Sequence, residues 1–253
     1  MKKIISVFFL TLFTLGLFTS TVKADHSWGN YHWARTANPF TLKLGDNLTS
    51  NWKPFLNTTS VDWSVSSVLD TAVVTGQARK NCSATSGQVE VCNKKYGKNG
   101  WLGIAQIWVN GDHIIQAITK VNDTYFNTRT YNTSAWKNLV MCQEVGHTLG
   151  LDHQDETFDN TNLGTCMDYT NNPSTNQYPN AHDYEQLEIM YAHLDSLTTL
   201  SQSFGQTNKQ VILDALENEE NWGRKVSDNG KVAKYERIIG FNQKILTHVI
   251  WAE

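Results

Sequence analysis

Eleven residues near the middle of the chain, from Gln143 to His153, constrain the fold more than any other segment. They read Gln-Glu-Val-Gly-His-Thr-Leu-Gly-Leu-Asp-His. Gln143 and His147 are one helical turn apart, so on a helix both side chains project from the same face. Gly150 can adopt a positive φ and turn the chain sharply, which would bring His153 back towards that face. The segment therefore predicts a helix that ends in a tight turn, with three polar side chains converging on one point.

The residues before this segment extend the predicted helix to Ser134–Gly150. Thr133 or Ser134 can cap its N-terminus, because a hydroxyl oxygen accepts hydrogen bonds from the first free backbone N–H groups. Apolar residues recur at helical spacing and give the helix one side for the core: Trp136, Leu139, Val140, Val145 and Leu149.

Two ligands one helical turn apart, with a third beyond the helix, are typical of a zinc site. Gln143, His147 and His153 are therefore the candidate metal ligands, and one catalytic Zn²⁺ is the expected cofactor. Glu144 lies beside the ligand face, within reach of a water on an open metal position. We expect Glu144 to be the general base that takes the proton of this water and passes it to a leaving amine.

A second marker follows the third candidate ligand, where the chain reads Cys166-Met167-Asp168-Tyr169. With this Met-x-Tyr sequence, the region from Ser134 to Leu194 resembles the metzincin clan of zinc endopeptidases, with features of its matrixin, astacin and serralysin branches. The resemblance implies a metzincin-like α+β fold. A twisted mixed sheet would lie over the active-site helix, with a Met-turn and a C-terminal helix below. It also implies that Tyr169 is catalytic, as an additional metal ligand or a hydrogen-bond donor to the transition state.

The chain departs from this family at position 143, where the family has a histidine. An amide oxygen binds zinc less well than an imidazole nitrogen does. Three interpretations stay open. Gln143 binds the metal weakly, or another residue supplies the missing ligand, for which Tyr169, His113 and His182 are candidates. In the third, the site holds no metal, and the fold serves as an extracellular peptide- or glycan-binding module.

The four cysteines are Cys82, Cys92, Cys142 and Cys166. An even number in an exported chain suggests two disulfides. Of the three possible pairings we favour Cys82–Cys92 and Cys142–Cys166, since each closes a local loop. The second would tie the predicted helix to the segment just before Met167.

The first residues of the chain have the pattern of a secretory signal peptide, with a basic start, an apolar run and small residues near Ala24. We therefore divide the chain into a signal peptide at 1–24, a metzincin-like metallopeptidase domain at 25–194 and a C-terminal extension at 195–253. In that extension, Lys231–Ile239 and Lys244–Trp251 predict a β-hairpin.

Upstream, Phe40–Leu44 alternates like a strand, and 51–73 has apolar residues near helical spacing, with a possible interruption at Asn57–Ser60. Trp101–Val109 and His113–Val121 predict a second hairpin, along whose edge an extended peptide could bind. His182–His193 predicts an amphipathic helix.

The mature chain is mildly acidic and has no basic patch, which argues against nucleic acid as a partner. No later segment is apolar enough for stable membrane association.

An acidic turn follows the predicted zinc motif, but it lacks an EF-hand pattern, so calcium is possible but unsupported; its residues are Asp152, Asp155, Glu156 and Asp159. The sequence predicts a secreted, monomeric zinc endopeptidase that acts on polypeptides, with the inactive binding module as the alternative.

Overall fold

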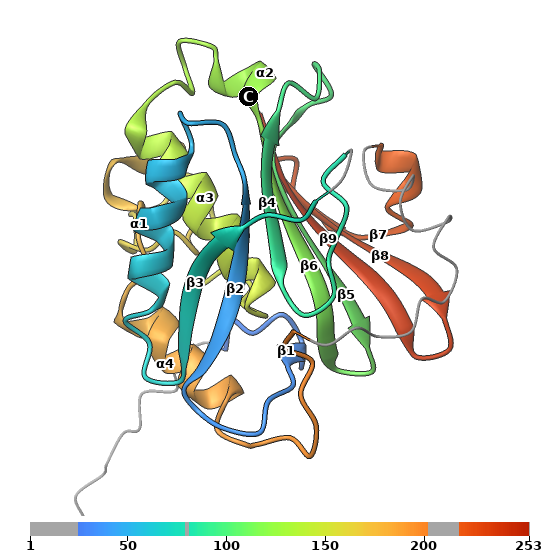
Figure 1. The fold of residues 1–253 in the computed structure, drawn as a ribbon. Helices are drawn as coiled ribbons and strands as arrows, with labels where there is room; N and C mark the ends of the chain where they lie inside the picture. The colour runs from blue at the N-terminus through green and yellow to red at the C-terminus, as the bar shows by residue number, and fades with distance from the viewer. Residues whose placement is uncertain (1–24, 79–80, 202–217, 253) are drawn as a thin grey trace, which may run out of the picture.

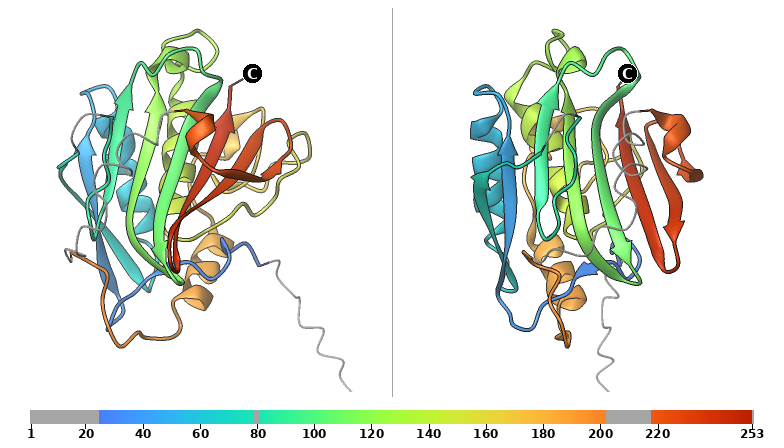
Figure 2. Two further views of the ribbon diagram at one scale, coloured as in Figure 1. Left: turned by 90° about the vertical axis from the view of Figure 1, so that its right-hand side faces the viewer. Right: turned by 45° about the vertical axis from the view of Figure 1, so that its right-hand side comes forward.

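The computed structural model describes residues 25–78, 81–201 and 218–252; the predicted signal peptide lies outside them. The described residues form a mixed α+β fold with a nine-stranded sheet (Figures 1 and 2). Its strands are β1 His32–Trp33, β2 Phe40–Asn47, β3 Leu69–Thr75, β4 Val89–Lys94, β5 Trp101–Asn110, β6 His113–Asn122, β7 Arg224–Asp228, β8 Val232–Gly240 and β9 Gln243–Trp251. Its helices are α1 Lys53–Trp63, α2 Asp123–Phe126, α3 Ser134–Thr148 and α4 Ala181–Met190, with short 3₁₀ helices η1 Pro173–Thr175 and η2 Glu219–Asn221.

The strands lie in the order β3-β2-β4-β6-β5-β9-β8-β7, and β1 pairs with the start of β6. The pairings among β2, β3, β4 and β6 are parallel, whereas those from β6 through β5 to β7 are antiparallel. Helices α1 and α3 cover one face of the sheet (Figure 1). Among the described residues, no helix is both long enough and apolar enough to cross a membrane.

The C-terminal hairpin forms as predicted, and it joins the main sheet. Strand β9 pairs with β5 along its whole length, from Trp101 opposite Trp251 to Asn110 opposite Gln243. Both edges of this second hairpin, along which we expected that an extended peptide could bind, are therefore paired within the chain itself, with β4 and with β9. That expectation is wrong for this conformation, because β9 already satisfies the backbone hydrogen bonds that a peptide would use.

The prediction of one long helix over 51–73 is half wrong. Helix α1 runs without the predicted interruption but ends at Trp63, and β3 follows and pairs in parallel with β2. Ser64 Oγ donates to the Ser60 carbonyl and accepts from the backbone N–H of Thr71, so it fixes the turn between the two elements. The β-branched residues of the second half favour a strand once an extended neighbour is available.

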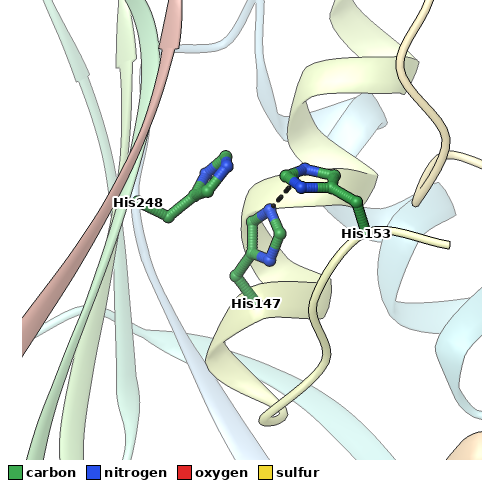
Figure 3. A group of neighbouring side chains, drawn as sticks. All are labelled: His147, His153 and His248. Carbon is green, nitrogen blue, oxygen red and sulfur yellow. Dashed lines mark hydrogen bonds between the residues drawn. The ribbon is translucent and has the colours of Figure 1, made fainter. Parts of the chain in front are cut away.

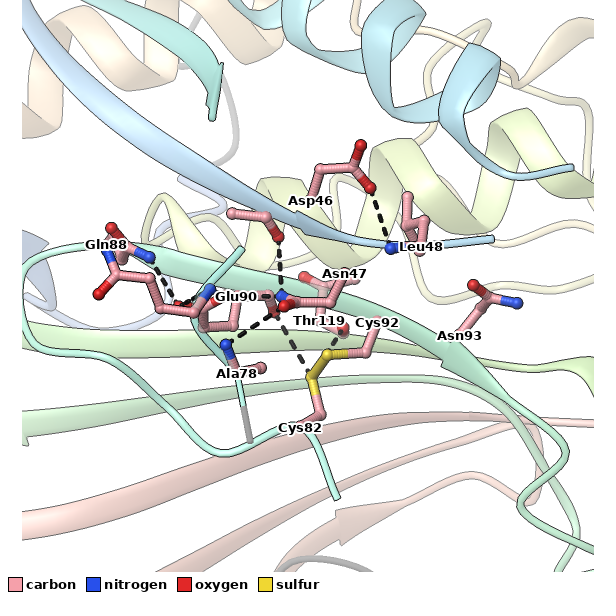
Figure 4. Close-up of a disulfide and its surroundings, with 12 residues drawn as sticks. Asp46, Asn47, Leu48, Ala78, Cys82, Gln88, Glu90, Cys92, Asn93 and Thr119 are labelled. Atoms are coloured by element: carbon pink, nitrogen blue, oxygen red, sulfur yellow. Dashed lines mark hydrogen bonds between the residues drawn. A yellow bond between two sulfur atoms is a disulfide. The ribbon is translucent and has the colours of Figure 1, made fainter. Parts of the chain in front are cut away.

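Both predicted disulfides are present, between Cys82 and Cys92 and between Cys142 and Cys166. Figure 4 shows the first, which fastens a loop to β4. Beside it, the buried carboxylate of Glu90 accepts hydrogen bonds of 2.6 Å from the side-chain amides of Asn47 and Gln88. Because several donors satisfy it, this buried carboxylate contributes to the packing of the parallel strands.

Candidate metal centre

The active-site helix predicted from the sequence is α3. Thr133 caps it by accepting a 3.2 Å hydrogen bond from the backbone N–H of Trp136. The turn after the helix needs Gly150, which has a φ of +95°, and a Cβ there would lie 2.1 Å from the carbonyl oxygen of Tyr31. This turn returns the chain to the helix, so that His153 faces His147 with 3.1 Å between their Nε2 atoms.

A third histidine completes the group, and the sequence motif did not include it. His248 of β9 projects towards α3, so that His147, His153 and His248 each offer a ring nitrogen within 4.8 Å of the others (Figure 3). Strand alternation explains its direction. Leu246 and Ile250 belong to the core cluster under α3, and His248 lies between them on the same face. All three imidazoles are buried.

The geometry of these imidazoles suits a zinc ion. His147 Nδ1 lies 2.9 Å from the carbonyl oxygen of Leu151, which can only accept, so Nδ1 carries the hydrogen and Nε2 keeps its lone pair. In a tetrahedral site with Zn–N of about 2.0–2.1 Å, neighbouring ligand atoms lie about 3.3–3.4 Å apart, close to the 3.1 Å between His147 and His153. Burial, together with the neighbouring imidazoles, lowers the pKa of His147 and His248, which keeps both in the neutral form that binds metals.

The side-chain amide of Gln143 is held by a hydrogen bond to the backbone. Its Nε2 donates a 2.8 Å hydrogen bond to the carbonyl oxygen of Cys166, next to the disulfide with Cys142. Its Oε1 is buried and has no hydrogen-bond partner among the described residues. A role for Gln143 as a ligand therefore stays a prediction, whereas His248 adds an imidazole nitrogen to the pair from the motif.

Two of the other candidates for the missing ligand lie in different surroundings. His182 stacks on His26, with ring centroids 4.9 Å apart. His113 lies 3.2 Å from a carboxylate oxygen of Asp195, at the start of β6. The sequence did contain a signal for His248, namely a histidine within an otherwise buried strand, but no local motif connects that strand to α3.

The predicted catalytic residues Glu144 and Tyr169 both contact His248. Glu144 Oε2 lies 3.3 Å from His248 Nδ1, and the Tyr169 hydroxyl lies 3.2 Å from His248 Nε2. Glu144 Oε1 is buried without a partner among the described residues. Burial raises the pKa values of the Glu144 carboxyl and the Tyr169 hydroxyl well above their usual ranges. A carboxylate at Glu144 would accept the Nδ1–H of His248 and leave Nε2 free to bind a metal.

Glycines allow the close packing around these side chains. A Cβ at Gly103 of β5 would lie 2.7 Å from Glu144 Oε1, and a Cβ at Gly146 of α3 would lie 2.6 Å from Met167 Sδ. Met167 is buried against α3 at Gly146, and its role in a Met-turn stays a prediction. Neither glycine can carry a side chain without moving Glu144 or Met167.

Two carboxylates of the acidic turn after the helix pair with a lysine of the C-terminal hairpin. Lys234 of β8 places its Nζ 2.7 Å from carboxylate oxygens of both Asp152 and Glu156. Asp152 also lies 3.5 Å from His153 Nδ1. Burial alone would raise the pKa of Asp152, but His153 and Lys234 hold it below its usual value. The C-terminal hairpin therefore holds the loop that carries His153.

Comparisons with known proteins add little to this geometry. No protein-family model matches the sequence, and no curated protein matches it. Among solved structures, a crystal structure of myroilysin is similar at 12% sequence identity and a TM-score of 0.36, over 63% of this chain and 86% of that one. At this level of similarity, inference about function depends on the side chains of the site.

Proposed function

We propose that this protein is a zinc-dependent endopeptidase whose metal is held by His147, His153 and His248. The observation that carries the proposal is the convergence of these three imidazoles beside the carboxyl group of Glu144. When bound, zinc would act as a Lewis acid and lower the pKa of a coordinated water. Secretion belongs to the same proposal, supported by the paired cysteines and the predicted signal peptide.

Three protein side chains supply the proton transfer, the hydrogen bond to the oxyanion and the orientation of a ligand. Glu144 has one oxygen near His248 and a second, Oε1, without a partner among the described residues, and this second oxygen can hold a proton taken from water. The Tyr169 hydroxyl keeps its proton because burial raises its pKa, so it can donate a hydrogen bond to an oxyanion. A carboxylate oxygen of Asp152 lies 3.5 Å from Nδ1 of His153, where it would favour a hydrogen on Nδ1 and a lone pair on Nε2.

Access to this site requires a change from the conformation described here. Strand β9 occupies the free edge of β5, and the three histidines and Glu144 are buried. Catalytic zinc sites keep an open position, whereas structural ones are closed. In our proposal the described conformation is a closed form of the enzyme, which admits a peptide when a segment other than β9 moves, because β9 carries the ligand His248.

The closed site also favours a second candidate function. A buried metal centre without an access route would be structural, and the protein would be a non-catalytic extracellular binding module. This alternative requires zinc without proteolysis. The two functions are therefore distinguished by measuring zinc content and activity in the same preparations.

The experiment compares wild type with Glu144→Gln, which preserves the shape of the side chain and its contact with His248. The control is Glu188→Gln, an exposed carboxyl on α4. We expect wild type and the control to cleave an unfolded protein substrate, and Glu144→Gln to keep its zinc but lose about 10²–10⁴-fold in rate. Full activity in Glu144→Gln would refute the mechanism. Zinc binding without any cleavage by wild type would favour the structural alternative.

A second pair of variants tests the ligands. His248→Ala should lose about one equivalent of zinc relative to wild type, because it removes one of three imidazoles. Gln143→Ala should retain that zinc, since its amide nitrogen is bound to the Cys166 carbonyl. The opposite result would restore Gln143 as the third ligand and exclude His248.

A further inference from the structure

A second group of histidines lies where β1 pairs with the start of β6. Six of the eight histidines in the chain fall into two groups, and the remaining two stack on each other. In the second group, parallel pairing of β1 with β6 places His32 opposite His113. The segment after α4 adds His193 and Asp195. Three parts of the chain that are distant in sequence therefore meet at this point.

The ligand atoms of this group have the spacing of a metal site. His32 Nε2 lies 3.2 Å from His193 Nε2 and 3.5 Å from Asp195 Oδ1, and His193 Nε2 lies 3.7 Å from the same oxygen. For zinc with N and O ligands at about 2.0–2.2 Å, neighbouring corners of the tetrahedron are about 3.3–3.6 Å apart. His113 Nε2 lies 3.2 Å from Asp195 Oδ1 but outside the group of mutually close ligand atoms, so its ring would have to move to supply a fourth ligand.

Neighbouring groups hold these ligands in the forms that a metal requires. His32 Nδ1 lies 2.7 Å from the carbonyl oxygen of Asn30, so Nδ1 carries the hydrogen and Nε2 presents its lone pair. Asp195 Oδ2 accepts hydrogen bonds from the backbone N–H of Arg35 at 3.1 Å and from its guanidinium at 2.8 Å. The other oxygen, Oδ1, remains directed at the three histidines. This arrangement is typical of the hydrogen bonding that orients metal ligands.

We propose that His32, His193 and Asp195 bind a second zinc ion, and that His113 moves towards the ion to become its fourth ligand. The site is structural, because it fastens β1 and the segment after α4 to the start of β6. His32 is buried, whereas His193 is half-exposed, so the ion can enter from the His193 side. The proposal does not depend on the peptidase function, since it shares no ligand with the first group.

The test uses zinc alone as the probe. Metal-free full-length protein is titrated with zinc against a competing indicator, for wild type, His193→Ala, His182→Ala and His147→Ala. His193→Ala should bind about one zinc fewer than wild type. His182→Ala, which changes a histidine outside both groups, should bind as many as wild type. His147→Ala should keep the ion that His193→Ala loses, so failure of the first site and failure of the second are distinguishable.

Thermal unfolding gives an independent measurement of zinc binding at the second site. Zinc at about 100 times its dissociation constant from this site should raise the Tm of His147→Ala by roughly 5–10 °C. The same zinc should leave a His147→Ala/His193→Ala double variant unchanged. His193→Cys should restore binding, because a thiolate is also a zinc ligand. Equal zinc content and equal Tm shifts with and without His193 would overturn the proposal and leave the group as a hydrogen-bonded network.

Discussion

Replacing Asp183 by asparagine should make the stability of the protein less dependent on pH. Asp183 is fully buried at the start of α4, where its Oδ2 accepts hydrogen bonds from the Thr165 hydroxyl and the backbone N–H of Asn180. Its Oδ1 lies 3.6 Å from His26 Nε2, and neither atom has a hydrogen-bond partner among the described residues. Burial raises the pKa of Asp183 to about 6.

The size of the effect follows from this pKa. Between pH values of about 4 and about 6, folded Asp183 keeps a proton that the unfolded chain has released. The free energy of unfolding therefore falls as pH rises through this window. Above it, the ionised buried carboxylate costs about 3 kcal/mol, from a shift of about two pKa units at about 1.4 kcal/mol each. Asparagine cannot ionise, and its amide can donate to His26 while its oxygen keeps the helix cap.

Urea unfolding of metal-free protein measures the effect, with chelator present so that zinc binding does not contribute to the pH dependence. We expect the free energy of unfolding of Asp183→Asn, relative to wild type, to rise by about 2 kcal/mol between about pH 4.5 and about pH 8. Glu188→Gln, an exposed change on the same helix, is the control and should show no such rise. A difference between Asp183→Asn and wild type that is equal at both pH values would refute the reasoning.

Three further changes test how the first metal centre is supported. Gly103→Ala should reduce the free energy of unfolding by about 1–3 kcal/mol in a urea titration, because the added methyl group overpacks the contact of β5 with α3. Lys234→Met should weaken zinc binding by about 10–100-fold in a competition titration, since Asp152 beside His153 loses its cation. Replacing both Cys142 and Cys166 by alanine should cost about 3 kcal/mol of stability in the same urea assay, and a loss below 1 kcal/mol would contradict the role given to this cross-link.

The helix that carries the site was predictable because local and tertiary signals agree there. Thr133 supplies a cap, an apolar stripe faces the core, and Gly150 ends the helix where the chain must turn. The two disulfides and the hairpins were predictable for the same reason, since short sequence separations and alternating patterns specify them. In each of these cases the determining residues lie within a few turns of one another.

The predictions were wrong where contacts between segments that are distant in sequence determine the structure. The second half of 51–73 became β3 because β2 offered a parallel partner, and helical spacing alone could not reveal this. The role of His248 could not be read from the motif, because it depends on β9 pairing with β5 and on which face of β9 each side chain occupies. The same holds for the second group, which depends on the parallel pairing of β1 with β6.

The C-terminal hairpin would contribute to the proposed first metal centre in two ways that depend on one register. His248 of β9 lies opposite Ala105 of β5 and opposite Lys234 of β8. A shift of β9 by one residue would turn His248 to the other face of the sheet. A displaced β8 would also withdraw Lys234 from the loop that carries His153. Because zinc binding then requires a correctly paired hairpin, the ion would stabilise the closed sheet as it binds. Moving β9 away from β5 would also remove the His248 ligand, so a bound ion would hold this edge of β5 closed.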